Sequence, residues 1–467
     1  MSILNNSNRI YLIGVKGVGM TALAQHLLAQ NKEVWGSDVA EDFVTTPVLK
    51  KLGLKIYDNF SAEHINGQID LVIRSTAYGE NNIEVQTAES KKIPIFTYPE
   101  ALGELTAGYT GVAVAGSHGK TTISAMLAHI LKHANLNPRA IVGSVVPQFG
   151  GNALIGSGDI FVYEADEYQN KFQYFSPRGI ILTSVDWDHP DFFPTPNDYE
   201  AAFVNFLKKI PSDGFIVPCF DSPIVKKVVA EAGLQPEQII SYGLREGEWS
   251  LVRTWLDEGK WHFSVAHGEE FVGDFWLRLI GSHNVANAMA ALACATKLGV
   301  DIEIIRQALA SFEGTARRLE KKAKLNNGVY VIDDYAHHPS EIKASLKALK
   351  AFYPYKKIRC VFQPHTFTRT KALLPDFAIA FADADEVVIM DIYGSAREEQ
   401  GGISSEDVVV EIKKHHKNVE YQGKIDNALE YLISTAGRSD LVVTMGAGDV
   451  WQVGEKMITQ IGKVEEV

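Results

Sequence analysis

The first hundred residues alternate short apolar runs with amphipathic segments. The runs RIYLIGV (9–15), KEVWGSD (32–38), DLVIRSTA (70–77) and IPIFTY (93–98) have the length and apolar content of buried strands. After the first run, apolar residues fall on one helical face at Met20, Leu23, Ala24, Leu27 and Leu28. This alternation predicts a doubly wound parallel sheet.

A second block with the same pattern follows residue 106. The run GVAVA (111–115) predicts a strand, and the helix expected after it has its apolar face at Ile123, Met126, Leu127, Ile130 and Leu131. Further strands are expected in FVYEADE (161–167) and GIILTSVDWDH (179–189), which both end in acidic residues or histidine. Residues 241–280 are richer in tryptophan and β-formers and predict a small antiparallel piece.

A third block begins near Gly314. Each of its strand-like runs is followed directly by polar residues or glycine: VYVIDDYAHHP (329–339), IRCVFQPH (358–365), EVVIMDIYG (386–394) and LVVTMGAGD (441–449). Ligands of open α/β sheets gather outside the carboxyl ends of the strands. We therefore expect these four endings to converge on one site.

Composition narrows the class of protein. The 467 residues are enough for roughly three domains of about 150 residues. The net charge of −12, without a basic block, argues against a nucleic-acid partner, and no apolar stretch reaches the length of a membrane span. Cys219, Cys294 and Cys360 stand far apart, so we expect neither disulfides nor a zinc site, and a cytoplasmic setting.

The segment AGSHGKTT (115–122) is typical of a phosphate-binding loop. Its glycines let the backbone approach phosphate oxygens, Lys120 can neutralise β- and γ-phosphates, and the hydroxyl of Thr121 can bind Mg²⁺. The spacing departs from the usual template, because Val114 stands where the first glycine would be. The alternative is a turn with an incidental lysine, which the strand before and the helix after it disfavour.

Two strand endings and one helix offer further ligands. Hard oxygen and nitrogen ligands for Mg²⁺ are expected at Glu164, Asp166, Glu167, Asp186, Asp188 and His189, unless these residues form ordinary solvated turns. Asn284 and Asn287 stand three residues apart at the start of an apolar helix. Their carboxamides could read the edge of a base, or one of them could cap the helix.

The glycine loop GVKGVGM (14–20) follows the first strand. Gly14, Gly17 and Gly19 form the pattern G-x-x-G-x-G, which suits any diphosphate at a helix N-terminus and is weak support for NAD. Asp38 could accept a ribose hydroxyl or merely end a strand. An NAD-dependent oxidoreductase is the alternative built on this loop, but it leaves the second and third blocks without a role.

The third block collects charged and imidazole groups at its strand ends. Arg369, near His365, is suited to bind a carboxylate by charge-assisted hydrogen bonds. Asp333, Asp334, His337 and His338 lie on a neighbouring strand ending. The histidines could instead form a surface metal site or a helix cap.

In this order, the motifs resemble the Mur ligase family of cytoplasmic enzymes that build peptidoglycan precursors. The resemblance runs through GVKGVGM, AGSHGKTT, EADEY, DWDHPD, GSHNVANAMAA, GTARRLE, DDYAHHPSEI, FQPHTFTRT and GAGD, essentially the whole chain. It implies three α/β domains with mainly parallel sheets. These are a Rossmann-like UDP-sugar domain (1–107), a P-loop ATPase-like ATP domain (108–314) and a Rossmann-like amino-acid domain (315–467).

The resemblance also implies residue roles. ATP would be bound by Gly116, Ser117, His118, Gly119, Lys120, Thr121, Thr122, Asn284, Asn287, Arg318 and Asp334. Mg²⁺ would be bound by Thr121, Glu164 and His189, and the catalytic residues would be Lys120, Glu164, His189 and Arg318. UDP-N-acetylmuramate would contact Gly14, Gly17, Gly19, Met20, Asp38 and Ser75, and the amino acid would contact His337, His365 and Arg369.

The implied reaction is ATP-dependent amide formation through an acyl phosphate, by a monomer or weak homodimer. FQPHTFTRT and DIYGSARE resemble the family members that add L-alanine to UDP-N-acetylmuramate, while EADEYQNKF also resembles those that add murein tripeptide. Glycine or serine as the amino acid stays open. Many family members carry Arg where this chain has Thr366, so Arg369 or Arg397 is expected to compensate.

Overall fold

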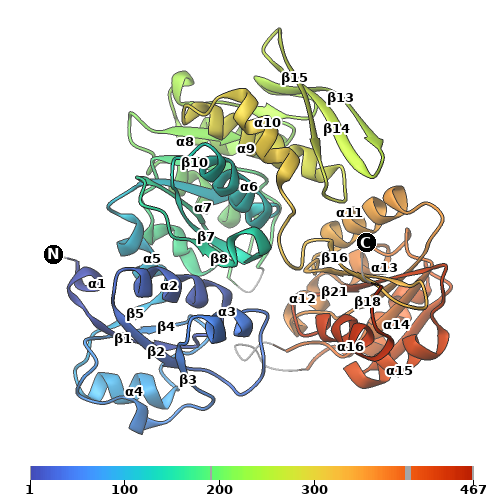
Figure 1. Ribbon diagram of the computed structural model, residues 1–467, viewed down its shortest axis with the longest axis horizontal. Coiled ribbons are helices and arrows are strands. Elements are labelled where there is room, and N and C mark those ends of the chain that lie inside the picture. The colour runs from blue at the N-terminus through green and yellow to red at the C-terminus, as the bar shows by residue number, and fades with distance from the viewer. Residues whose placement is uncertain (1, 190–191, 395–400, 465–467) are drawn as a thin grey trace.

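Residues 2–189, 192–394 and 401–464 are described by a computed structural model with three mainly parallel sheets (Figure 1). The N-terminal sheet has five parallel strands in the order β3-β2-β1-β4-β5. Its elements are α1 (Ile3–Asn6), β1 (Arg9–Ile13), α2 (Val18–Ala29), β2 (Glu33–Ser37), α3 (Thr46–Lys51), β3 (Lys55–Tyr57), η1 (Ala62–His64), β4 (Leu71–Arg74), α4 (Ile83–Ser90), β5 (Ile95–Thr97) and α5 (Tyr98–Thr106). The first strand is shorter than predicted, because Gly14 adopts a φ of +83° directly after it.

The central sheet has six strands in the order β11-β10-β6-β9-β7-β8, with only β8 antiparallel among them. Its elements are β6 (Thr110–Ala115), α6 (Lys120–His133), β7 (Arg139–Val146), η2 (Pro147–Phe149), β8 (Gly151–Leu154), β9 (Ile160–Glu164), η3 (Tyr168–Tyr174), β10 (Gly179–Leu182), α7 (Pro196–Leu207), β11 (Phe215–Pro218), α8 (Pro223–Ala232) and η4 (Pro236–Gln238). β10 ends before the predicted acidic ending, so Asp186, Asp188 and His189 lie in the loop beyond it.

The predicted antiparallel piece is confirmed as a small sheet that projects from the central domain (Figure 1). It consists of β12 (Tyr242–Gly243), β13 (Trp249–Asp257), β14 (Lys260–His267) and β15 (Glu270–Leu277), where β12 pairs in parallel and the others are antiparallel. Two helices follow, α9 (His283–Lys297) and α10 (Ile302–Ser311). α9 packs against α6, the helix that begins at the phosphate loop.

The C-terminal sheet has six strands in the order β16-β17-β21-β18-β19-β20, and only β16 is antiparallel among them. Its elements are β16 (Glu320–Lys324), β17 (Tyr330–Asp334), α11 (Pro339–Phe352), β18 (Lys357–Phe362), α12 (Phe367–Ala372), α13 (Leu374–Ala378), β19 (Glu386–Met390), α14 (Ser405–Lys413), β20 (Val419–Gly423), α15 (Ile425–Thr435), β21 (Asp440–Met445) and α16 (Trp451–Ile461). The α/β class with mainly parallel sheets is thus confirmed.

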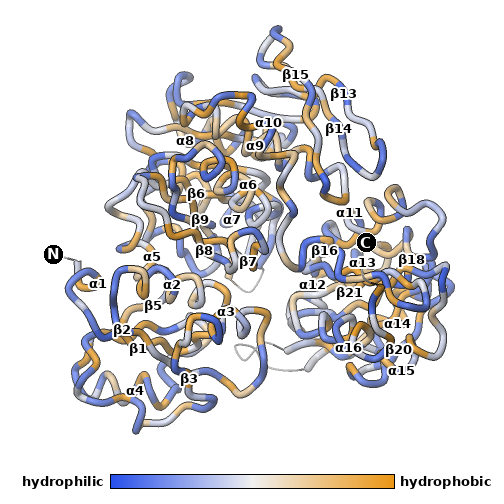
Figure 2. The backbone as a smooth tube through the Cα atoms, in the orientation of Figure 1, coloured by the Kyte–Doolittle hydropathy of each residue, from blue (hydrophilic) through white to orange (hydrophobic). Residues whose placement is uncertain are grey.

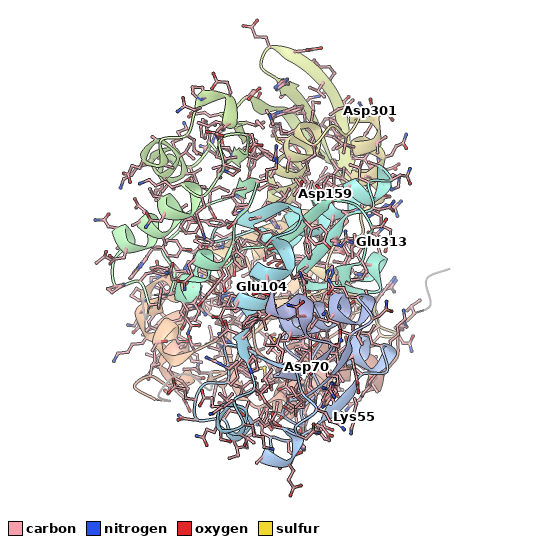
Figure 3. All side chains as sticks on the ribbon, turned by 90° about the vertical axis from the view of Figure 1, so that its left-hand side faces the viewer. Lys55, Asp70, Glu104, Asp159, Asp301 and Glu313 are labelled. Atoms are coloured by element: carbon pink, nitrogen blue, oxygen red, sulfur yellow. The ribbon has the colours of Figure 1, made fainter. Side chains whose placement is uncertain are left out.

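Hydrophobic stretches recur in the interior of each sheet-and-helix unit, while many outer loops are hydrophilic (Figure 2). Among the helices of the described residues, none combines the length and apolar character needed to cross a bilayer. Figure 3 shows one face of the molecule, on which Asp70 and Glu104 belong to the N-terminal unit and Asp159 and Glu313 to the central unit above it.

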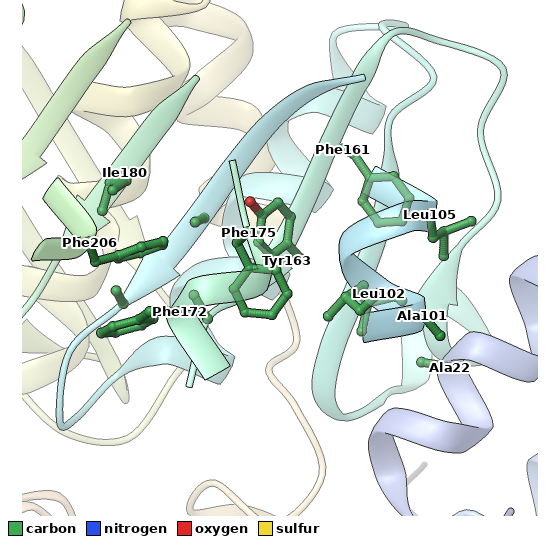
Figure 4. Close-up of a cluster of buried hydrophobic side chains, with 14 of the residues drawn as sticks. Ala22, Ala101, Leu102, Leu105, Phe161, Tyr163, Phe172, Phe175, Ile180 and Phe206 are labelled. Carbon is green, nitrogen blue, oxygen red and sulfur yellow. The ribbon is translucent and has the colours of Figure 1, made fainter. Parts of the chain in front are cut away.

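The N-terminal and central units share one hydrophobic core. Ala22 on α2 and Leu102 on α5 belong to the same buried cluster as Phe161 on β9 and Phe206 on α7 (Figure 4). Apolar burial contributes roughly 25 cal/mol per Å² and needs no directional partner. This shared cluster therefore fixes the first two units to each other.

A buried asparagine adds a polar connection to the same interface. The side chain of Asn152, on β8, is fully buried and donates to the carbonyl oxygen of Val18 at 2.6 Å. It also accepts from Nε2 of Gln25 at 2.7 Å. Asn152 therefore ties the glycine loop and α2 directly to the central sheet.

We expect Asn152→Ala to lower the thermal midpoint of unfolding, because both partners of the carboxamide lose a buried hydrogen bond. A buried group without its partner costs about 1–3 kcal/mol. Asn197→Ala is the control, since Asn197 is exposed at the start of α7. Equal midpoints for the two variants in a thermal scan would contradict this account of the interface.

Candidate functional site

The phosphate loop is shaped by two glycines in conformations that other residues rarely adopt. Gly116 has a φ of +128° and Gly119, directly before α6, a φ of +79°. A Cβ on Gly116 would lie 2.2 Å from Oγ1 of Thr183, and one on Gly119 would lie 2.7 Å from Oδ1 of Asn287. The two glycines therefore allow a tight loop, although Val114 stands where the usual phosphate-loop template has its first glycine.

Lys120 is the first residue of α6 and turns back over the loop. Its Nζ donates to the carbonyl oxygen of Gly116 at 2.5 Å and lies 3.7 Å from Oε2 of Glu167. Burial lowers the pKa of Lys120, but the carboxylates of Glu167, Asp166 and Glu164 outweigh it and raise the pKa above its ordinary value. A permanent positive charge at a helix N-terminus is suited to an anionic phosphate chain.

Glu164, the last residue of β9, is held by Thr121 at the start of α6 and by Gly143 on β7. Its Oε2 accepts from Oγ1 of Thr121 at 3.1 Å, and the backbone N–H of Gly143 donates to Oε1. Burial raises the pKa of Glu164 above its ordinary value. The hydroxyl and the carboxylate thus stand side by side, as one octahedral Mg²⁺ would need.

Three further ligand groups converge beside this pair. Asp166, Glu167 and His189 each offer an atom within 4.8 Å of the others. Oε2 of Glu167 is buried without a hydrogen-bond partner in the described part of the chain, while its Oε1 accepts from Tyr199 at 2.9 Å. An orphaned carboxylate oxygen next to a carboxylate and an imidazole fits a divalent cation.

Asp166 and Glu167 were among the Mg²⁺ ligands expected from the acidic strand endings, whereas the family resemblance implied only Thr121, Glu164 and His189. Both residues lie between the end of β9 and the start of η3. His189 has a φ of +57°, and its Nε2 lies 3.9 Å from Oε1 of Glu167.

A cavity of about 290 Å³ begins beside the phosphate loop. Asn284 and Asn287 line it together with Asp334, and the helix-cap alternative for these asparagines is not observed. Instead, Nδ2 of Asn284 donates to the carbonyl oxygen of Ile280 at 2.9 Å, and Nδ2 of Asn287 donates to Oδ1 of Asn284 at 2.9 Å. The lining also includes Cys219, Tyr242 and His283, which sequence reasoning missed because they are distant in the chain.

Asp334, at the end of β17, faces this cavity from the C-terminal unit. It accepts from Oγ of Ser345 at 2.6 Å and from the N–H of Ala336 at 3.0 Å. Burial raises its pKa to about 6. Arg318 lines the same cavity, and its Nη2 donates to Oγ1 of Thr121 at 3.4 Å. The cavity is thus lined by both the central and the C-terminal units.

The imidazole and guanidinium groups of the third block are brought together as predicted. The rings of His337 and His365 have centroids 6.1 Å apart, and Nη1 of Arg369 lies 3.4 Å from Nδ1 of His365. Nη2 of Arg369 donates to Oδ1 of Asp188 at 3.3 Å, while its buried Nε has no partner in the described residues. One donor of Arg369 therefore remains for an anionic ligand.

Thr366 has a specific role in the QPHT segment. It adopts a φ of +67° and its hydroxyl oxygen accepts from the N–H of Arg369 at 3.4 Å, which caps α12. Arg397, the other expected compensating residue, lies outside the described residues. Thr366 therefore positions the start of the helix that carries Arg369, and a long cationic side chain is absent at this position.

The first glycine loop is closely packed against aromatic rings. A Cβ on Gly14 would lie 2.6 Å from Tyr78, and one on Gly19 would lie 2.6 Å from Tyr98. Gly17 contributes an open backbone, since a Cβ there would meet only the Gly14 carbonyl oxygen at 3.4 Å. The loop therefore presents main chain rather than side chains to its surroundings.

Asp38 is occupied by its own chain. Its carboxylate accepts from the N–H of Lys16 at 2.7 Å, the N–H of Val39 at 2.9 Å and the hydroxyl of Tyr78 at 2.9 Å. This supports the strand-end alternative over a free ribose acceptor. Met20 is buried, and Oγ of Ser75 accepts from the N–H of Ala77 at 3.3 Å.

A second cavity, of about 260 Å³, lies where all three units meet. Gly17 and Phe43 line it from the N-terminal unit, Ser144 from the central unit, and Tyr393 and Trp451 from the C-terminal unit. This cavity therefore brings residues of all three units beside the N-terminal glycine loop.

Three family models match the chain in succession. They are the Mur ligase family catalytic domain (residues 9–110), the Mur ligase middle domain (114–295) and the Mur ligase glutamate ligase domain (317–448). The chain belongs to the Mur ligase family. The resemblance derived from the sequence motifs is confirmed, and the NAD-dependent oxidoreductase alternative loses its support.

Relatives cover nearly the whole Mur ligase chain. The UDP-N-acetylmuramate–L-alanine ligase of Desulfitobacterium hafniense is 40% identical over 96% of this chain and 99% of its own length. That of Caldanaerobacter subterraneus is 40% identical over 98% of both chains. Among solved structures, the UDP-N-acetylmuramate–alanine ligase of Thermotoga maritima is 28% identical with a TM-score of 0.83, over 97% of this chain and 98% of that one.

A murein peptide ligase from Psychrobacter arcticus has the same fold, with a TM-score of 0.74 and 22% identity over 98% of this chain and the whole of its own. This similarity concerns the fold alone. Ligases named for alanine and for murein peptide therefore share the architecture of this Mur ligase.

We expect Glu167→Gln to weaken binding of Mn²⁺, used as a Mg²⁺ substitute, by about tenfold or more. Even groups that only orient a metal ligand typically contribute about that much, and Glu167 loses a charge and an orphaned oxygen. The measurement is a titration that follows the paramagnetic resonance signal of free Mn²⁺. The exposed Glu269→Gln is the control, and unchanged affinity in Glu167→Gln would remove this residue from the metal site.

Proposed function

We propose that this Mur ligase joins L-alanine to the carboxylate of UDP-N-acetylmuramate at the expense of ATP, an early step of peptidoglycan synthesis. The observation that carries the proposal is 40% identity, over 96% of the chain, to a UDP-N-acetylmuramate–L-alanine ligase. The site chemistry supports it as well, because Lys120 of the phosphate loop lies 3.7 Å from Glu167 of the Asp166–Glu167–His189 cluster and Arg369 bonds Asp188 beside that cluster.

We assign one substrate to each unit. Residues 1–107 would hold the UDP-sugar, residues 108–314 ATP and residues 315–467 the amino acid. The UDP-sugar would lie on the backbone of Gly14, Gly17 and Gly19, near Met20 and Ser75, with Asp38 shaping the loop rather than binding directly. The proposed reaction belongs in the cytoplasm, since it consumes ATP.

The proposed nucleotide site follows the cavity beside α6. ATP would be bound by Gly116, Ser117, His118, Gly119, Lys120, Thr121, Thr122, Asn284, Asn287, Arg318 and Asp334. Thr121 and Glu164 would hold one Mg²⁺, and His189 with Asp166 and Glu167 would hold a second. These ions would neutralise charge on the transferring phosphoryl group.

In the proposed reaction the sugar carboxylate attacks the γ-phosphate of ATP. ADP is the leaving group, and the sugar carboxylate becomes an acyl phosphate. The amine of alanine then attacks the acyl carbon, and inorganic phosphate departs. Lys120 stabilises the negative charge that develops on the phosphoryl oxygens, and Arg318 reaches the same region from the other side. Arg369, His337 and His365 would hold the alanine carboxylate, so that the amine points toward the acyl carbon.

The C-terminal unit contributes to the wall of the cavity, which matters for the lifetime of the proposed acyl phosphate. An acyl phosphate hydrolyses when water reaches it, and the cavity is lined by Asp334 and Arg318 of the C-terminal unit as well as by α9. Exclusion of water therefore favours attack by the amine over attack by solvent.

The alternative is a murein tripeptide ligase that acts on the same UDP-sugar, which the shared fold leaves open. ADP release should be measured with UDP-N-acetylmuramate alone, with added L-alanine, glycine or L-serine, and with added tripeptide. We expect the largest stimulation with L-alanine. A larger stimulation by tripeptide would overturn the alanine assignment, and no stimulation by any amine would overturn the ligase proposal.

We expect Lys120→Ala to lower alanine-dependent ADP release by about a hundredfold or more, because one preorganised charge on the transferring group is removed. Binding of UDP-N-acetylmuramate, measured by calorimetry, should be retained, since its glycine loop lies in a different unit. Loss of UDP-sugar binding in a folded Lys120→Ala variant would contradict the assignment of the two substrates to separate units.

A further inference from the structure

Glu341 stands where the phosphate loop meets the loop that carries His337. It is the third residue of α11, and its Oε2 accepts from the backbone N–H of His337 at 3.2 Å and that of His338 at 3.3 Å. Its other oxygen, Oε1, lies 3.2 Å from Nδ1 of His118 in the phosphate loop of the central unit. One carboxylate thus bonds both loops at once.

We propose that Glu341 is a positioning residue that couples occupation of the phosphate loop to the geometry of the amino-acid pocket. The inference rests on the proposed function, because it assigns His337 to the pocket of the incoming amino acid. Glu341 acts through His118 on one side and through the segment 335–338 on the other, and it also lines the cavity assigned to ATP.

An ordinary helix cap does not explain this arrangement. Asp198 on α7 and Asp407 on α14 also complete capping boxes, and the bonds of those carboxylates go to their own N-cap residues, Thr195 and Ser404. Glu341 makes the same local cap with Oε2, and its Oε1 contacts His118 of the central unit. The second contact is the feature that a purely structural cap would not need.

The contact between His118 and Glu341 joins two charged groups. Burial alone would lower the pKa of His118, but hydrogen bonds with Asp186 and Glu341 raise it to about 9. Burial also opposes ionisation of Glu341, yet His337, His118 and Arg318 hold its pKa well below the ordinary value. The 3.2 Å separation of Nδ1 of His118 and Oε1 of Glu341 is the length of a hydrogen bond, so the two units are in direct polar contact at this point.

The second arm leads from Glu341 to the pocket. His337 is fixed by its N–H bond to Glu341 and by contact of its Nδ1 with the carbonyl oxygen of Tyr335 at 3.1 Å. Its ring faces His365, which contacts Arg369. A small displacement of segment 335–338 therefore moves one wall of the pocket relative to the phosphate loop, and displacements of about 1 Å can cost a hundredfold in rate.

A double-mutant cycle tests the coupling. Glu341→Gln removes the charge but keeps an oxygen that can cap α11, and His118→Ala removes the partner from the other unit. We expect each single variant to raise the KM for both ATP and L-alanine by about tenfold, the effect of losing one charged hydrogen bond. We expect the double variant to resemble the single ones, because both changes break the same link.

Asp407→Asn is the matched control, since it weakens a capping box on α14 without a contact to the phosphate loop. Its KM values should equal those of the unmodified chain, while its thermal midpoint falls. The proposal is overturned if His118→Ala leaves the KM for alanine unchanged, if the two changes multiply to about a hundredfold, or if Asp407→Asn shifts the KM values equally.

The experiment separates this inference from the proposed function. Absence of alanine-dependent ADP release in the unmodified chain would refute the function itself. Normal release in the unmodified chain, with both single variants unaffected, would refute only the coupling through Glu341. If Glu341→Gln fails to fold, the response of the alanine KM to His118→Ala decides the question, because His118 belongs to the other unit.

Discussion

The polar junction between the phosphate loop and the C-terminal unit is the constraint on which the site depends. The N-terminal and central units are joined by a continuous apolar cluster, whereas the C-terminal unit meets the phosphate loop through Arg318–Thr121, Arg369–Asp188 and His118–Glu341. Apolar burial fixes two bodies without regard to charge, but charged contacts respond to what lies between them. The first two units are thus joined by an extended apolar cluster, whereas these contacts of the C-terminal unit are polar or charged.

Pairing of opposite charges also explains why several carboxylates lie close together beside the phosphate loop. Carboxylates at Glu164, Asp166 and Glu167 would repel one another in an apolar interior, but Lys120 lies among them and its ammonium is stabilised in return. Oε2 of Glu167 lies 3.7 Å from Nζ of Lys120, yet it has no hydrogen-bond partner in the described part of the chain. A buried carboxylate oxygen that accepts no hydrogen bond is suited to bind a cation, because such an oxygen does not stabilise the fold.

Much of the fold could be predicted because buried parallel strands occur in the sequence as short apolar runs, and polar residues follow each run directly. That rule brought Lys120, Glu164, His337 and Arg369 to the correct edges of their sheets. It could not predict Glu341, whose second partner, His118, lies 223 residues away in another unit. Nor could it show that Asp38 is saturated by Lys16, Val39 and Tyr78, because satisfaction of a carboxylate depends on three-dimensional neighbours rather than on spacing.

The close approach of Gly119 to Asn287 has one more consequence. A side chain at residue 119 would collide with the carboxamide, so the phosphate loop and α9 are held at a fixed separation. The loop backbone and the Asn287 carboxamide therefore cannot shift independently, because almost no free space separates them. Any larger residue at position 119 would disturb the loop and α9 together, so the absence of a side chain there preserves two parts of the cavity at once.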